Sequence, residues 1–366
     1  MKKILIGFIS NGKGGGLDQY LLNFFHTVNS DTVQFDFLTN QATEPLRQEL
    51  AQGHASLYEV PSLSHPLKQY RRIRALIREN AYDMAYFNVS TAVTYPAVKA
   101  AHDGGIPKVY VHSHSAGYDC ANTLRRRAMT ALHRMLKGPL CRSANGYYAC
   151  SDKAAEWLFT RQVCQSGKVH YIQNSIDTSQ FAFCPQKRQA LREKYGLTDK
   201  FVIGTVGNML YQKNHPFLID IFQRVVQSEP NAVLFIAGDG PLRPALEAKV
   251  REYGLEDKVI MPGRVATADG YMSAFDVFAL PSHFEGMPIV SVEAQCSMLP
   301  CVLSDTITRE ASLSNRCDFV PLDDVDLWAK KLLSYRGADR QQMKITRELS
   351  SFDLEKQRAE LLDILR

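Results

Sequence analysis

The chain has 366 residues, of which 45% are hydrophobic and 22% charged, and its formal net charge is +5. This balance excludes a disordered or fibrous chain, the small net charge gives no reason to expect a nucleic-acid partner, and the length favours two hydrophobic cores over one. No run of about 18 uncharged apolar residues occurs and residues 1–10 are too short for a signal peptide, so a cytoplasmic location is expected.

Residues 1–180 alternate short apolar runs with helical patterns. The helical patterns include residues 17–29 and 67–79, and the apolar runs read KILIGFIS, VQFDFLT, SLYEV, DMAYFN, KVYVHS and NGYYACS. A repeated strand-helix-strand order predicts a parallel sheet covered by helices on both faces. The rhythm breaks after Asp177, where a Phe/Cys/Pro stretch at 181–185 marks the expected linker.

Residues 181–345 repeat this organisation. A charged helical pattern over 187–195 precedes the runs FVIGTVG, AVLFIAG, KVIMPG, AFDVFALPS, LPCVLS and DFVPL. The expected fold class is therefore α/β, with two facing Rossmann-like, doubly wound parallel-sheet domains. Because ligands bind beyond the carboxyl ends of such strands, a deep cleft is expected between them. Residues 346–366 hold an amphipathic pattern over 354–365, expected to form a helix that packs back toward the first domain.

Charge is divided unevenly along the chain. Residues 1–180 hold 20 Lys and Arg against 13 Asp and Glu, and residues 181–366 hold 23 against 25, so the first half carries +7 and the second −2. This asymmetry indicates that the first half faces an anionic partner, either a membrane surface or a phosphorylated acceptor. The eight cysteines form no CxxC pair, which argues against a zinc site or a disulfide framework.

The first apolar run ends in a glycine-rich turn, Asn11-Gly-Lys-Gly-Gly-Gly16, just before a helical pattern. Glycines at such a junction let backbone approach a ligand closely, and the free N–H groups of a helix start favour phosphate. The spacing is not that of the dinucleotide fingerprint, and no acidic residue clearly ends the second run. A purely structural turn is therefore an alternative.

The strongest local pattern is Pro281-Ser-His-Phe-Glu285-Gly-Met-Pro288-Ile-Val-Ser-Val-Glu293. Proline is favoured in a first helical turn, which predicts an exposed helix N-terminus at this point. Its N–H groups and positive dipole end suit a diphosphate. Glu285 is expected to precede the helix and Glu293 to lie about two turns inside it, so that one carboxylate reaches a sugar and the other a ribose.

These strings together resemble the retaining glycosyltransferases of family 4, which have the GT-B fold. The resemblance spans nearly the whole chain, with the strongest likeness to bacterial enzymes of exopolysaccharide or capsule synthesis. Besides the block around Glu285, it rests on His112-Ser-His114, Cys150-Ser-Asp-Lys-Ala-Ala, Asn174-Ser-Ile-Asp177 and Gly238-Asp-Gly240-Pro-Leu.

The resemblance implies roles for individual residues. Glu285 would bind hydroxyls of the donor sugar and Glu293 the ribose hydroxyls. His114 would lie near the donor sugar at the reacting centre, and Lys213 would pair with the departing diphosphate. The remaining donor-binding positions are Gly15, Gly16, Gly286, Met287, Pro288 and Ile289, whose backbone would approach the phosphates.

One position departs from the family pattern. The family commonly carries an arginine ahead of the catalytic lysine, whereas this chain has Asn208. Asn208 supplies no charge, so either Lys213 and helix amides alone hold the diphosphate, or another base such as Arg264 compensates. The loss of one charge-assisted hydrogen bond costs roughly 1.5–3 kcal/mol, which slows an enzyme without abolishing its activity.

The expected reaction moves a sugar, most simply from a UDP-sugar, to a saccharide or lipid-linked saccharide acceptor with retention of configuration. No cofactor and no metal are expected, because no carboxylate or cysteine spacing completes a site beside the His112–His114 pair and no strand-end DxD motif occurs. A non-catalytic sugar-nucleotide-binding subunit and a nucleotide-sugar epimerase of the same fold are alternatives. A dehydrogenase is disfavoured by the missing glycine fingerprint.

A basic helical pattern covers residues 124–137. Its apolar residues, Leu124, Ala128, Ala131, Leu132, Met135 and Leu136, recur at helical spacing. Five basic residues are expected mainly on the opposite side, namely Arg125, Arg126, Arg127, Arg134 and Lys137. This pattern suits peripheral attachment to the inner face of an anionic membrane, although an ordinary surface helix of a sheet domain gives the same apolar stripe.

Overall fold

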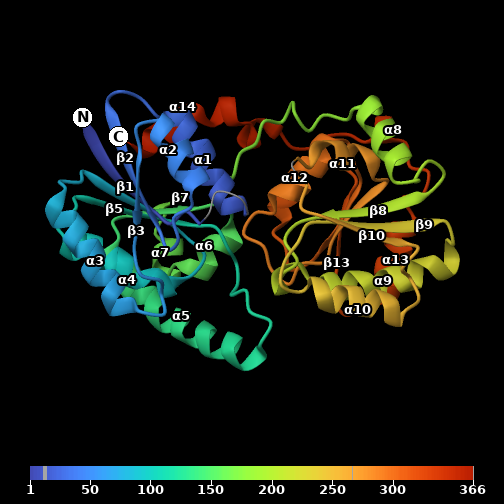
Figure 1. The fold of residues 1–366 in the computed structure, drawn as a ribbon, viewed down its shortest axis with the longest axis horizontal. Coiled ribbons are helices and arrows are strands. Elements are labelled where there is room, and N and C mark those ends of the chain that lie inside the picture. Colours follow the sequence, from blue (N-terminus) through green and yellow to red (C-terminus); the bar gives the residue numbers. More distant parts are fainter. Residues whose placement is uncertain (11–14, 266, 366) are drawn as a thin grey trace. The chain divides into compact units, whose positions relative to one another are not determined.

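The computed structural model describes residues 1–10, 15–265 and 267–365, which form two compact units (Figure 1). The first unit comprises residues 1–118, 122–175 and 356–366, and the second comprises residues 119–121 and 176–355. The chain thus passes into the second unit within the Asn174-Ser-Ile-Asp177 string. It returns inside the terminal helix α14 (Leu354–Ile364), which covers the amphipathic pattern predicted at that end.

The first unit is built on a parallel sheet of seven strands. Each of the six apolar runs of residues 1–180 forms a strand of this sheet. A seventh, at the sheet edge, lies in a segment where no strand was predicted, because it is only three residues long and mostly exposed. The strands are β1 (Lys2–Gly7), β2 (Val33–Thr39), β3 (Ser56–Glu59), β4 (Met84–Val89), β5 (Lys108–Ser113), β6 (Gly146–Ala149) and β7 (Val169–Tyr171), in the spatial order β3-β2-β1-β4-β5-β6-β7.

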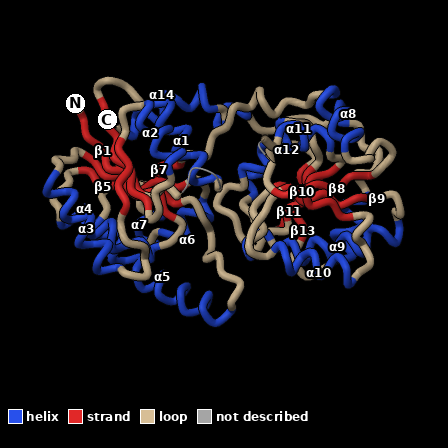
Figure 2. Tube along the Cα trace, viewed as in Figure 1, coloured by secondary structure: helices blue, strands red, loops and turns tan. Residues whose placement is uncertain are grey.

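Helices lie on both sides of this sheet (Figure 2). They cover the central strand β4 on both faces, so that all six of its residues are buried, which explains why that strand reads as a nearly continuous apolar run. The helices are α1 (Gly16–Val28), α2 (Glu44–Gln52), α3 (Pro66–Glu79), α4 (Tyr95–Asp103), α5 (Thr123–Ser143), α6 (Asp152–Leu158) and α7 (Arg161–Gln165), with a short 3-10 turn, η1 (Ala92–Thr94), before α4.

The second unit has a parallel sheet of six strands, one for each predicted run. These are β8 (Phe201–Val206), β9 (Ala232–Ala237), β10 (Val259–Gly263), β11 (Val277–Leu280), β12 (Cys301–Ser304) and β13 (Cys317–Val320), in the order β10-β9-β8-β11-β12-β13. The helices and 3-10 turns of this unit are α8 (Pro185–Lys194), η2 (Tyr211–Lys213), α9 (His215–Ser228), α10 (Arg243–Glu252), α11 (Asp269–Ala274), α12 (Ile289–Cys296), η3 (Arg309–Ala311), α13 (Val325–Leu333), η4 (Arg340–Gln342) and η5 (Leu349–Phe352).

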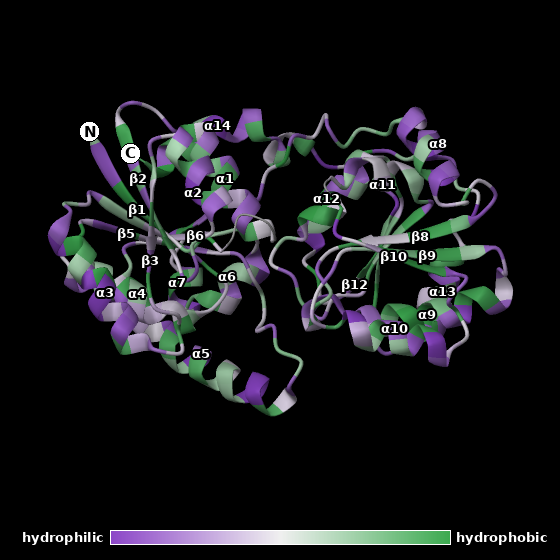
Figure 3. Cartoon of the chain, in the orientation of Figure 1, coloured by the Kyte–Doolittle hydropathy of each residue, from purple (hydrophilic) through white to green (hydrophobic). Residues whose placement is uncertain are grey.

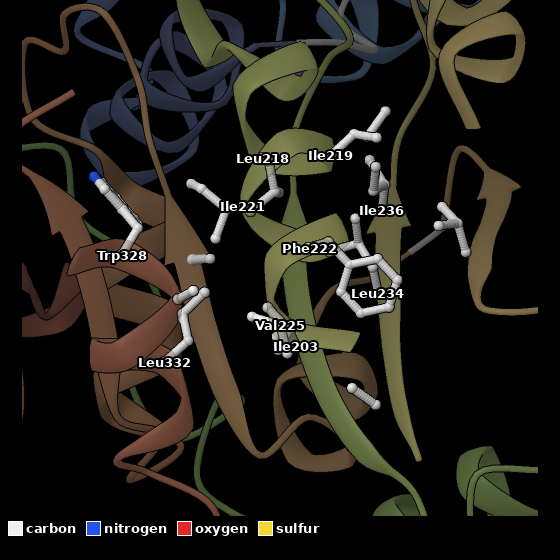
Figure 4. Close-up of a cluster of buried hydrophobic side chains, with 14 of the residues drawn as sticks. Ile203, Leu218, Ile219, Ile221, Phe222, Val225, Leu234, Ile236, Trp328 and Leu332 are labelled. Carbon is white, nitrogen blue, oxygen red and sulfur yellow. The ribbon is translucent and has the colours of Figure 1, made fainter. Parts of the chain in front are cut away.

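The core of the second unit lies between its sheet and the helices α9 and α13. Leu218, Phe222 and Trp328 are fully buried there, in one cluster with side chains of β8, β9, β11 and β12 (Figure 4). The indole Nε1 of Trp328 donates to the carbonyl oxygen of Pro321 at 2.7 Å, so that this large side chain is buried without an unpaired polar atom. The core therefore fixes the strands whose carboxyl ends carry the motif residues.

Both sheets reverse their strand order once. In the first sheet the reversal lies between β1 and β4, and in the second it lies between β8 and β11. A doubly wound sheet binds its ligand outside the carboxyl ends of the strands at such a reversal, because the helices that follow the two strands lie on opposite faces and leave an opening. The topology thus directs attention to the segments that follow β1, β4, β8 and β11.

Candidate functional site

Two charged residues from distant parts of the sequence meet at the strand-order reversal of the second sheet. Lys213 ends η2, the 3-10 turn that follows β8, and Glu285 lies in the loop between β11 and α12. The strands β8 and β11 pair directly, so their following loops share one edge. The ammonium Nζ of Lys213 lies 2.8 Å from the carboxylate Oε1 of Glu285.

The carboxylate of Glu285 is held by three side chains. Besides Lys213, the hydroxyl of Ser282 donates to its Oε1 at 2.7 Å and the amide Nε2 of Gln212 donates to its Oε2 at 2.8 Å. Glu285 is only 5% exposed, and a buried carboxylate is stable only when it is paired and hydrogen-bonded in this way. Both oxygens therefore have defined directions before any ligand binds.

Neither Gln212 nor Ser282 was predicted as a site residue. Gln212 stands one residue before Lys213 and Ser282 stands three residues before Glu285, but sequence spacing does not show where an amide or hydroxyl points. Asp119 was also not predicted: it belongs to the second unit, and its Oδ1 accepts from the backbone N–H of Gln212 at 2.9 Å. This contact helps to fix the turn that carries Lys213.

Close backbone packing positions the loop between β8 and η2. A Cβ added to Gly207 would lie 3.2 Å from Cε of Lys213, and one added to Gly238 would lie 1.9 Å from the carbonyl oxygen of Gly207. A Cβ on Gly240 would lie 2.6 Å from the carbonyl oxygen of Met209. Only glycine fits at Gly238 and Gly240, which explains the Gly-Asp-Gly string after β9: it lets that loop support the one carrying Lys213.

The helix after Glu285 begins one residue later than the sequence indicates. Pro288 is the N-cap residue of α12 rather than part of its first turn, and Ile289 is the first helical residue. Gly286, Met287 and Pro288 are buried. The first N–H groups of a helix have no intrahelical partner, so those at Ile289 and just after it are suited to a phosphate, and their contact with one stays a prediction.

Glu293 is the fifth residue of α12, so it lies little more than one turn inside the helix rather than two. Burial raises the pKa of the Glu293 carboxyl to about 7; the charge of nearby Asp269 also raises this pKa, while that of Lys213 lowers it. Burial has removed this carboxyl from most of its solvating water. A hydroxyl of a bound ligand can take the place of that water and donate a hydrogen bond to the carboxylate.

We expect the thermal stability of the Glu293→Gln variant to exceed that of the wild type increasingly as pH rises from 5 to 8. The folded pKa of Glu293 lies above its usual 4.5, so the folded protein retains a proton that the unfolded chain has lost, and wild-type stability falls through this window. Glutamine does not titrate. The difference at pH 8 should be on the order of 2 kcal/mol, and a gap in melting temperature that does not change with pH would contradict the assignment.

His114, the predicted site histidine of the first unit, lies between two asparagines. His114 follows β5, and its Nε2 lies 2.9 Å from Oδ1 of Asn88 in β4, while its Nδ1 lies 3.1 Å from Oδ1 of Asn174. Burial lowers the pKa of His114 to about 3, so the imidazole is neutral at pH 7. Both ring nitrogens have an asparagine partner, so a sugar hydroxyl would bind the neutral imidazole by replacing one of them, without adding charge. Asn174 begins one of the strings that carry the family resemblance, but sequence spacing does not show that either asparagine meets His114.

The neighbouring His112 has a structural role. Its Nδ1 lies 2.6 Å from the hydroxyl of Tyr86, which in turn contacts the hydroxyl of Tyr20 at 2.8 Å, and all three side chains are buried. The two histidine rings lie against each other with centroids 4.0 Å apart and their planes tilted by 39°. His112 thus orients His114 within an aromatic cluster.

The glycine-rich turn borders the same asparagine. Gly16 begins α1, and a Cβ on it would lie 4.0 Å from Nδ2 of Asn174; Gly15 is the extended N-cap residue of α1. Gly16 thus lies near Asn174, a partner of His114, and the expected contact of Gly15 and Gly16 with phosphates stays a prediction. The rest of the turn, residues 11–14, lies outside the described residues.

Asn208 and Arg264 occupy separate places in the second unit. Asn208 lies in the loop between β8 and η2, where its carbonyl oxygen accepts from the N–H of Leu210 at 2.8 Å. Arg264 is exposed and follows β10, which β9 separates from β8. The sheet order thus does not place Arg264 on a strand next to that of Lys213, and its role in compensating for Asn208 remains a prediction.

Comparisons with known proteins agree with this geometry. A family model described as "Glycosyltransferase Family 4" matches residues 14–180, and one described as "Glycosyl transferases group 1" matches residues 200–335. The chain is 30% identical to the putative glycosyltransferase EpsF of Bacillus subtilis over 95% of this chain and 91% of that protein. It is 24% identical to an Escherichia coli UDP-Gal:alpha-D-GlcNAc-diphosphoundecaprenol alpha-1,3-galactosyltransferase over 74% of this chain and 71% of that protein.

Solved structures show the same fold. Anabaena HepE in complex with UDP and glucose superposes with a TM-score of 0.78 at 18% identity, covering 100% of this chain and 99% of that one. WaaG, a glycosyltransferase involved in lipopolysaccharide biosynthesis, superposes with a TM-score of 0.71 at 15% identity, covering 98% and 99%. Two doubly wound parallel-sheet domains in this order define the GT-B fold, and the chain is a glycosyltransferase. It belongs to glycosyltransferase family 4.

Proposed function

We propose that the chain transfers a sugar from a UDP-sugar to a saccharide or lipid-linked saccharide acceptor, with retention of the anomeric configuration, in the synthesis of a bacterial surface polysaccharide. The observation that carries this proposal is the buried Lys213–Glu285 pair at the strand-order reversal, next to the N-terminus of α12 and to Glu293. The name of one relative supports the donor and acceptor classes, because that enzyme transfers galactose from UDP-Gal to a diphosphoundecaprenol-linked sugar. The similarity to EpsF, which covers nearly the whole chain, supports glycosyl transfer itself.

The reaction breaks the bond between the anomeric carbon and the donor phosphate oxygen. Negative charge develops on the departing diphosphate, where the Lys213 ammonium and the first N–H groups of α12 stabilise it more strongly in the transition state than in the ground state. To reach the phosphate, the ammonium shifts away from Glu285, whose carboxylate then accepts hydrogen bonds from hydroxyls of the sugar. Substrate contacts thus replace the ion pair of the ligand-free protein.

Retention follows if the acceptor hydroxyl attacks from the face that the phosphate leaves. The new bond joins the acceptor oxygen to the anomeric carbon, and a phosphate oxygen of the leaving group takes the acceptor proton, so no protein nucleophile is needed. The oxocarbenium-like state resembles that of glycosidases, but the leaving group here needs no strong protein acid. Neutral His114 suits this route because it binds a hydroxyl without stabilising a competing charge.

The proposal is tested by measuring thermal stabilisation of the purified protein by UDP-, GDP- and dTDP-sugars. A UDP-sugar at 100 times its dissociation constant should add about 2.7 kcal/mol to the free energy of unfolding. The anomeric configuration of the product, read by proton NMR, should match that of the donor. Stabilisation without transfer to any acceptor would indicate a sugar-nucleotide-binding subunit, and epimerised donor without acceptor would indicate an epimerase.

Transfer should not depend on a divalent cation, because in this proposal Lys213 and the helix N–H groups neutralise the diphosphate. We expect turnover in excess EDTA to remain within about twofold of the untreated rate, since no step of the proposed route uses a metal. Loss of activity in EDTA that manganese or magnesium restores would overturn this part of the proposal. A transferase known to require manganese, assayed in parallel, controls for effective chelation.

A further inference from the structure

The helix α5 presents an apolar stripe to solvent. Leu124 and Met135 are 78% and 74% exposed, and Leu132 is 38% exposed. Among the described residues, eight large hydrophobic side chains are exposed, and three of them lie on this one helix. At 3.6 residues per turn, Leu124, Ala128, Ala131 and Met135 fall within about 60° of one another. A surface helix normally turns such a stripe toward the core.

The orientation of α5 is fixed by His133 on its opposite side. His133 is buried, its Nδ1 accepts from the backbone N–H of Ala92 at 3.0 Å, and its Nε2 lies 2.8 Å from the carbonyl oxygen of Trp157. The ring also stacks on the indole of Trp157 with centroids 3.9 Å apart. Because the polar contacts of His133 bury that face of α5, the apolar stripe on the opposite face points to solvent.

The sequence predicts that the basic residues of α5 lie mainly opposite the stripe. In the structure most of them do not. Arg125, Arg127 and Arg134 are exposed and lie on both sides of the stripe, whereas Arg126 and Lys137 lie on the inward side, where Lys137 donates to the carbonyl oxygen of Glu156 at 2.7 Å. The outward face of α5 is therefore apolar along its centre and cationic along its borders.

Neighbouring helices extend this positive surface. The helices α3, α4 and α5 pack side by side on one side of the first sheet (Figure 1) and hold 12 Lys and Arg against 2 acidic residues. Residues 1–180 hold 20 against 13, so the remaining residues of that half hold 8 against 11. The whole positive excess of the first half lies in this one layer, where Figure 3 shows hydrophilic and hydrophobic residues interleaved along α5.

We infer that the outward face of α5, with the basic layer of α3, α4 and α5, docks on the surface of an anionic lipid bilayer. Apolar side chains at the centre suit the boundary between headgroups and acyl chains, and flanking arginines suit lipid phosphates. Each base near such a surface adds about 1 kcal/mol. A second copy of the chain is a poorer occupant, because it would bring the same arginines together. No helix of the described residues could span a bilayer.

The inference rests on the proposed function only for its consequence, that a lipid-linked acceptor would be reached at this surface. It is tested by flotation of the full chain with vesicles of equal phosphatidylcholine and phosphatidylglycerol at low salt, with pure phosphatidylcholine vesicles as the neutral comparison. The protein should float with the anionic vesicles alone, and high salt should release it. Failure to float at low salt would overturn the inference.

Two variants separate the contributions of charge and apolar contact. Arg125→Gln/Arg127→Gln/Arg134→Gln should lower the vesicle partition coefficient roughly 100-fold, and Leu124→Ser/Met135→Ser should lower it roughly tenfold or more. The matched controls, Arg251→Gln/Lys330→Gln/Arg358→Gln and Leu327→Ser, change exposed residues elsewhere and should float like the wild type. Equal losses in controls and α5 variants would show only a general charge effect and contradict the assignment.

Two further measurements separate this inference from the proposed function. The Glu285→Ala variant should float like the wild type even if it transfers no sugar, so a failed transferase assay leaves the docking result intact. Size-exclusion chromatography distinguishes a second copy of the chain from a lipid surface: a dimer that the Leu124→Ser/Met135→Ser variant dissociates would assign the face to self-association and overturn membrane docking.

Discussion

Replacing Glu285 by alanine should lower kcat roughly 10³-fold while the fold remains intact. The carboxylate is one of the few charged groups buried at the strand-order reversal, and its proposed partner in the transition state is the donor sugar rather than the core. Loss of one preorganised electrostatic contact in a site from which water is excluded typically costs factors of 10²–10³, and Lys213 would also lose its anchor. Steady-state kinetics with a saturating donor measure the effect.

Glu285→Gln is the comparison variant because Gln212 and Ser282 can still hydrogen-bond its side chain. It should fold as well as the wild type by circular dichroism and thermal melting, but remain strongly impaired in turnover. Near-normal turnover in either variant would remove Glu285 from the reaction and leave the ion pair with a structural role only.

Replacing Lys213 by alanine should lower kcat 10²–10³-fold, because no other side chain of the loop after β8 brings a cation to the leaving diphosphate. The loss should appear mainly in kcat rather than in the donor KM, since charge on the diphosphate increases as the bond to the sugar breaks. Lys213→Arg should retain part of the activity.

Asn208→Ala is the matched control within the same loop and should lose less than tenfold, because Asn208 carries no charge to remove. Lys249→Ala controls for stability: its ammonium forms an ion pair with Asp220 between α9 and α10, 2.6 Å apart and unrelated to the strand ends. Equal catalytic losses in Lys213→Ala and Asn208→Ala would show that the loop has been assigned incorrectly.

The strand series and the motif residues could be read from the sequence because both signals are local. A strand buried on both faces shows itself as an apolar run, and every predicted run forms a strand. Glu285, Gly286 and Glu293 stand in one short block, so their likeness to family 4 needs no knowledge of packing. The edge strand β7 was missed because three partly exposed residues carry no such pattern.

The tertiary structure alone decided which residues meet. Lys213 and Glu285 are 72 residues apart, and only the pairing of β8 with β11 brings their loops together. Asn88 and Asn174 contact His114 although they lie 26 and 60 residues away from it in the sequence. Sequence spacing does not indicate that these three residues meet. Side-chain partners at this range depend on strand order, which is set by the packing of the whole sheet.

The helix α5 shows the same division most clearly. The sequence determined that residues 124–137 form an amphipathic basic helix, since helical periodicity is a property of neighbouring residues. It could not determine which face turns inward, because an apolar stripe is compatible with either a core or a membrane. The buried contacts of His133 with Ala92 and Trp157 decided this orientation, since a helix face is buried only where distant residues supply partners for its polar atoms.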